Sequence, residues 1–253
     1  MTKGLSRRDL FKTAGVAGIA AVVPPALGQQ PEILAPPEAN DAPAHQPDNL
    51  AAADVLFFFN DEEARFIEAV VERLIPADPR WPGAAEAGVL YYIDHQLASA
   101  YGAGGRMYLR GPWVPDAAPE QGYQLRFSPA ELYRIGIEEA RAQIRDTTGS
   151  EFWDLTPAAM DSALKDLETG RTQLPSLPAA VFFETLLANT IEGFFGDPAY
   201  GGNRDMVGWR MVGFPGAYAA YLEEVDIYNL EYLREPVGMA NQQARLEHIH
   251  DHH

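Results

Sequence analysis

The sequence predicts an all-α protein: a compact domain of about five to seven helices with long loops. Two helix starts carry a capping box, in which Asn60 precedes Glu63 and Ser128 precedes Glu131 by three residues. Apolar residues recur at helical spacing behind both starts. No alternating run or hairpin turn competes with these signals. We therefore expect helices to form the core.

An export signal is expected to precede this domain, in residues 1–28. Arg7 and Arg8 form a twin-arginine pair, the apolar stretch 14–23 follows, and small residues up to Gly28 suit a cleavage site. The apolar stretch is too short to span a bilayer as a stable helix. The twin-arginine route carries folded proteins, so we expect the chain to fold before it reaches the periplasm.

Composition excludes several classes of function. The net charge is −17, and removing residues 1–28 takes away four basic residues and one acidic residue, which leaves about −20. Such a chain is not expected to bind nucleic acid, or to adsorb directly to anionic lipid. There is no cysteine, and no dinucleotide-binding, P-loop, zincin or nucleophile-elbow motif. We expect no catalytic, cofactor-binding or metal-binding residue here, and a partner that holds the cofactor.

Three further regions follow the signal. Residues 29–55 are rich in Pro and Ala without a helical period, so we expect a flexible or polyproline-like arm. The helical domain is assigned to residues 56–225 and a tail to residues 226–253. The tail ends in the run His248–His253, which is either solvated or an adventitious site for a divalent metal.

Five helices can be placed from caps and periodicity. They run from Asn60 to a stop at Pro76, over about Ala84–Ala98, from Pro129, from Pro157 to Gly170, and over about Ala179–Phe195. His95, on the second of them, has no partner at metal-ligand spacing. We expect His95 to lie at the helix surface or the edge of the core.

A long aromatic loop, residues 100–127, carries Tyr108 and Trp113 among Gly and Pro. Loops of this length in a compact domain are usually functional or disordered, and its aromatic content argues against disorder. Contact with a partner and capping of the core both remain open.

A second loop, Asp197–Asp205, is dense in turn-forming residues. It is either a tight loop whose side chains form hydrogen bonds with its own backbone groups, or a loop that contacts a partner protein. The two interpretations are compatible, because a rigid loop can present side chains to a partner. Tyr, Trp and Arg dominate buried contacts between proteins. The candidate partner interface therefore consists of Tyr108, Trp113, Tyr200, Asn203, Arg204 and Trp209.

Two strings in this region carry a family resemblance. Asp-Pro-x-Tyr-Gly-Gly-Asn lies at Asp197–Asn203, and Gly-Trp…Gly-Phe-Pro-Gly lies at Gly208–Gly216. Together with segments Ala69–Asp78, Ala87–Leu97 and Tyr108–Trp113, they resemble the small subunit, subunit 3, of gluconate 2-dehydrogenase-type dehydrogenases. The likeness covers roughly residues 60–217.

The resemblance implies a non-catalytic accessory subunit. In that family the large subunit is an FAD-dependent flavoprotein of the glucose–methanol–choline (GMC) oxidoreductase type, which oxidises a sugar or sugar acid. A multihaem cytochrome c typically accepts the electrons, and contact with the membrane is made through the complex. The small subunit carries the export signal and supports maturation of the flavoprotein. The alternative is a free-standing periplasmic enzyme or binding module without a recognisable motif.

Overall fold

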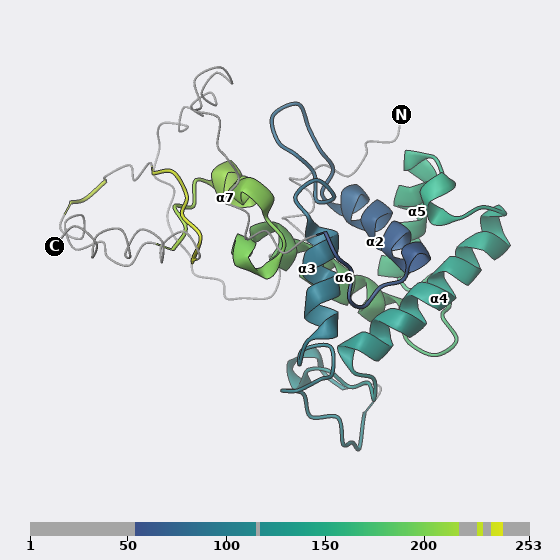
Figure 1. The fold of residues 1–253 in the computed structure, drawn as a ribbon. Helices are drawn as coiled ribbons and strands as arrows, with labels where there is room; N and C mark the ends of the chain where they lie inside the picture. Colours follow the sequence, from purple (N-terminus) through teal and green to yellow (C-terminus); the bar gives the residue numbers. More distant parts are fainter. Residues whose placement is uncertain (1–53, 115–116, 218–226, 230–233, 240–253) are drawn as a thin grey trace, which may run out of the picture. The chain divides into compact units, whose positions relative to one another are not determined.

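Helix α6 (Ala179–Phe195) is the central element of the helical domain (Figure 1). Its buried side chains include Phe182, Leu186 and Phe194, and a helix that is apolar on several faces is buried among neighbours. The helices that contact α6 are α2 (Asp61–Leu74), α3 (Val89–Ala98), α4 (Pro129–Thr148), α5 (Pro157–Glu168) and α7 (Val207–Val212).

A computed structural model describes residues 54–114, 117–217, 227–229 and 234–239. The export signal with Arg7 and Arg8, residues 29–53 of the arm, and the His-rich end of the chain lie outside the described residues. The described part contains six α-helices, four short 3-10 helices and no sheet, which confirms the all-α prediction. The 3-10 helices are Pro119–Gln121, Phe152–Asp154, Pro198–Tyr200 and Arg204–Met206.

Both capping boxes form as expected. The Asn60 side chain accepts hydrogen bonds from the backbone N–H groups of Glu62 and Glu63, and the Glu63 carboxylate accepts one from the Asn60 N–H, all at 3.0 Å. Ser128 and Glu131 exchange the same pair of bonds at the start of α4. These bonds satisfy N–H groups that the first turn of a helix otherwise leaves without partners.

The second helix starts later than predicted. Residues 84–88 form turns, and α3 begins only at Val89. Gly88 has a φ of +76°, in the left-handed region, so a regular right-handed helix cannot run through it. The expected start at Ala84 is therefore wrong by five residues, whereas the end at Ala98 is confirmed.

Aromatic pairs link the helices around α6. The rings of Tyr133 and Phe182 meet edge to face with centroids 6.0 Å apart, and those of Phe66 and Phe152 do so at 5.4 Å. Such pairs favour this geometry because the ring edge is positive and the face negative. No helix in the described ranges is both long enough and apolar enough to cross a bilayer.

Candidate functional site

The Asn203 loop (residues 196–206) connects α6 to α7 and is held from within by one side chain. Asn203 is fully buried; its Nδ2 donates to the Gly196 carbonyl (2.7 Å) and its Oδ1 accepts from the Gly208 N–H (2.8 Å). One amide thereby joins the end of α6 to the first turn of α7. Asp197 adds a second internal bond, because its Oδ1 accepts from the Ala199 N–H at 2.9 Å.

Three residues of this loop that are not glycine adopt left-handed backbone angles. The φ values are +47° for Asn203, +54° for Asp205 and +55° for Met206. Asn and Asp tolerate this region better than most residues, whereas for Met it is unfavourable. Clusters of such residues persist only where the surrounding contacts determine them, and they occur preferentially at functional sites.

Trp209 is a second buried residue that stabilises the Asn203 loop. Only 6% of its surface is exposed, and its indole N–H donates to the Phe195 carbonyl at 2.6 Å. The Phe214 ring meets the indole edge to face at 5.2 Å. Trp209 and Asn203 are thus buried within this chain, so they can position neighbouring residues but do not themselves form the outer surface of the loop.

Tyr200 and Arg204 form that outer surface. Tyr200 is 51% exposed. The backbone N–H of Arg204 donates to the Ala87 carbonyl (3.0 Å), and its guanidinium lies 4.6 Å from the centre of the Tyr91 ring. The same guanidinium forms an ion pair with Asp54. Arg204 therefore has a defined position and remains one-third exposed.

A buried carboxylate that the sequence reasoning missed fixes the segment in front of α2. Asp94 on α3 is fully buried and accepts hydrogen bonds from three consecutive backbone N–H groups, those of Phe57 (2.6 Å), Phe58 (3.0 Å) and Phe59 (2.7 Å). Such bonds compensate the burial of a charged group. His95, beside it, lies at the edge of the core as expected, with Nε2 3.2 Å from the Val55 carbonyl oxygen.

The other two predicted interface residues lie in the aromatic loop, away from the Asn203 loop. Tyr108 is largely exposed and Trp113 partly exposed. The aromatic loop leaves the C-terminal end of α3 (Figure 1), whereas Arg204 is bound beside the N-terminal end of that helix. The structure therefore brings Tyr200, Asn203, Arg204 and Trp209 together but places Tyr108 and Trp113 in a separate region.

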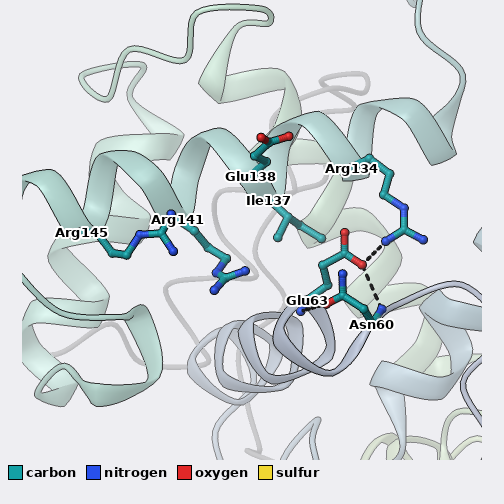
Figure 2. A pocket seen from close by; sticks show the side chains of 7 residues that line it. All are labelled: Asn60, Glu63, Arg134, Ile137, Glu138, Arg141 and Arg145. Atoms are coloured by element: carbon teal, nitrogen blue, oxygen red, sulfur yellow. Dashed lines mark hydrogen bonds and ion pairs between the residues drawn. The ribbon is translucent and has the colours of Figure 1, made fainter.

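A pocket of about 260 Å³ lies between α2 and α4 (Figure 2). Three arginines line it, Arg134, Arg141 and Arg145, whose spacing places them on one face of α4. Arg134 pairs with Glu63, and Arg141 and Arg145 both pair with Glu151, at 3.1 and 2.8 Å. Burial alone would raise the pKa of Glu151, but the bonds from these two arginines lower it. The arginines that line the pocket thus belong to an ion-pair network that links α4 to Glu63 of α2 and to Glu151.

A polar cluster of tyrosines lies between α3 and α6. The Tyr92 hydroxyl donates to Glu192 (3.4 Å), and the Tyr101 hydroxyl donates to Asn189 (3.3 Å). Burial, followed by the charge of Glu192, raises the pKa of Tyr92 to about 12. Burial also raises the pKa of Tyr101. Both hydroxyls therefore stay protonated at neutral pH and act as hydrogen-bond donors.

Within the described ranges, no group of three or more His, Cys, Asp or Glu side chains is arranged to hold a metal ion. The best-defined feature is instead the Asn203 loop, in which the buried residues Asn203 and Trp209 lie next to the exposed side chains of Tyr200 and Arg204. This arrangement suits recognition of another protein, because a preorganised loop loses little conformational entropy on binding.

Comparison with known proteins agrees with the resemblance inferred from the sequence. The family model described as gluconate 2-dehydrogenase subunit 3 matches residues 61–216, from the first residue of α2 to the end of the Gly-Phe-Pro-Gly string. Neither the curated proteins nor the solved structures include a significant match. The match covers more than half of the chain and includes the whole Asn203 loop. This chain therefore belongs to the gluconate 2-dehydrogenase subunit 3 family.

Proposed function

We propose that this chain is the non-catalytic small subunit of a periplasmic flavoprotein dehydrogenase complex, and that it supports export and maturation of the catalytic subunit. The observation that carries the proposal is the family match, which makes the chain an accessory protein of the subunit 3 type. The partner is a GMC-type large subunit that holds FAD. If the complex has a third subunit, the family resemblance makes that subunit a multihaem cytochrome c that holds haem c, and the complex makes the contact with the membrane.

The Asn203 loop supports the proposal by its construction. Tyr200 and Arg204 belong to the residue types that dominate binding energy between proteins. Arg204 is positioned by Ala87, Tyr91 and Asp54 before any partner arrives. A partner that binds these two side chains does not need to order the loop, so more of the contact energy contributes to affinity.

The export role rests on the sequence. Arg7 and Arg8 form a twin-arginine pair, and this route accepts folded proteins together with bound partners. A flavoprotein that folds around FAD in the cytoplasm and binds the small subunit there can leave the cell on this one signal.

In the test, Arg7 and Arg8 are both changed to Lys. The amounts of this chain and of the flavoprotein are then measured in the periplasm and in the cytoplasm. Co-export predicts that both the chain and the flavoprotein are lost from the periplasm, because one signal serves both. Folding of the chain in the cytoplasm is the control, since the substitution lies outside the helical domain. Normal periplasmic amounts of the flavoprotein, with the small subunit retained inside the cell, would exclude co-export.

A further inference from the structure

A C-terminal strap (Arg234–Met239) packs on the Asn203 loop and the segment after α7, although it lies outside the residues that the family model matches. The Val237 N–H donates to the Pro215 carbonyl (3.1 Å), and the Val237 carbonyl accepts from the Ala217 N–H (2.7 Å). The Met239 N–H donates to Oδ2 of Asp197 (2.8 Å). Asp197 thus binds both its own loop and the strap.

The contact is close because residue 216 is a glycine. A Cβ atom at Gly216 would lie 2.3 Å from the Val237 carbonyl oxygen and 2.8 Å from the Trp209 ring. Gly216 also has a φ of +81°, which side-chain-bearing residues rarely adopt. The strap can therefore approach Trp209, the buried support of the Asn203 loop, only with glycine at this position.

The strap and the end of α7 expose apolar side chains beside this contact. Val212 is 58% exposed, Phe214 47% and Met239 44%. Phe214 packs on Trp209, and the backbone of Met239 is bonded to Asp197. Figure 1 shows the strap beside α7. Exposed apolar side chains that form a patch are typical of surfaces that bind another protein.

The two segments that carry these side chains have no net charge, although the chain as a whole is strongly acidic. Residues 197–216 and 234–239 contain three basic and three acidic residues, whereas the whole chain has a net charge of −17. Arg210 and Glu235 form an ion pair across the two segments at 3.0 Å. The centres of protein interfaces are depleted of charged residues. Repulsion between two acidic chains disfavours a second copy as the occupant.

We propose that Val212, Phe214 and Met239, which the end of α7, the segment after it and the strap expose, form a second contact surface for the large subunit, next to Tyr200 and Arg204. The surface fits an apolar, uncharged face of that partner. This inference rests on the proposed function. The strap lies outside the residues that the family model matches, so the family match does not account for this contact.

The experiment places one negative charge on each segment of the surface. Val212→Glu and Met239→Glu are made singly in the full chain, because both side chains are about half exposed and their replacement removes little packing. Ala158→Glu, at an exposed position of α5, adds the same charge elsewhere and is the matched control. Affinity is measured against the FAD-dependent large subunit purified from the cells that produce this chain, and unfolding of each variant is measured in parallel.

Each surface variant should weaken binding by about tenfold or more, because the complex would bury an unpaired carboxylate. Ala158→Glu should bind like the wild type. If Tyr200→Ala weakens binding and neither surface variant does, the strap surface is refuted and the proposed function stands. If the wild-type chain does not bind the flavoprotein, both are refuted. Self-association of the chain alone that Met239→Glu abolishes would identify a second copy as the occupant and overturn the inference. The two variants lie in different segments, so one of them still tests the surface if the other fails to fold.

Discussion

Replacing Asn203 with Ala should destabilise the chain more than most single substitutions, because one buried amide closes the loop between α6 and α7. The change removes the bonds to the Gly196 carbonyl and the Gly208 N–H. A buried group left without a partner costs about 1–3 kcal/mol. Ala at a φ of +47° adds about 1–2 kcal/mol. The expected loss is therefore about 2–5 kcal/mol in the free energy of unfolding.

Two matched variants separate these contributions. Asn203→Gly removes the same bonds but adopts a positive φ freely, so it should be about 1 kcal/mol more stable than Asn203→Ala. Asn203→Asp retains an oxygen that accepts from the Gly208 N–H but loses the donor to the Gly196 carbonyl, so it should also destabilise the chain. The loss of stability should grow as pH rises through the pKa of the new carboxyl, because the buried group then becomes charged.

The assay is urea unfolding of the mature chain, followed by tryptophan fluorescence. For a domain of this size, about 2–4 °C of melting temperature corresponds to each kcal/mol, so thermal unfolding gives an independent measure. If Asn203→Ala unfolds within about 0.5 kcal/mol of the wild type, as ordinary surface substitutions do, the amide does not hold the loop. The Asn203 loop would then not be preorganised by this side chain.

Two further predictions concern Trp209 and Tyr92. Trp209→Ala should lower the free energy of unfolding by about 3–5 kcal/mol, because it removes a buried ring. Trp209→Phe keeps most of the ring and loses the hydrogen bond to Phe195, so it should lower the free energy of unfolding by about 1–2 kcal/mol. Equal effects of the two variants in urea unfolding would contradict the role of the ring in the core. The pKa of Tyr92 is raised to about 12, so its contribution to stability is complete below pH 10 and is lost as pH rises from 10 to 12. Tyr92→Phe should make the decline of stability over that range less steep, and an unchanged slope would refute the raised pKa.

Local signals made the helices predictable. The partners in both capping boxes are three residues apart, and Pro129 and Pro157 suit the first turn of a helix wherever they occur. The start of α3 was missed because the apolar pattern continues through Gly88. A Cβ atom at Gly88 would lie 2.4 Å from the side chain of Arg204, which is more than a hundred residues away in the sequence.

The candidate site was predictable only as a segment. Turn-forming residues marked the Asn203 loop, but burial of Asn203 and Trp209 depends on how α6 and α7 meet. The role of Asp94 depends on hydrogen bonds to backbone groups 35 to 37 residues away in the sequence. A single Asp in a helical sequence does not predict such bonds. Exposure of Tyr200 likewise became apparent only from the packed structure.

We expect this chain to bind a flavoprotein and to hold no flavin itself. The most direct measurement isolates the chain from periplasm with whatever remains bound to it, and records flavin absorbance and dye-reducing dehydrogenase activity before and after the subunits are separated. We expect flavin and activity to accompany the large partner and the isolated chain to have neither. Stoichiometric flavin in the isolated chain, or isolation of the chain without any flavoprotein, would contradict it.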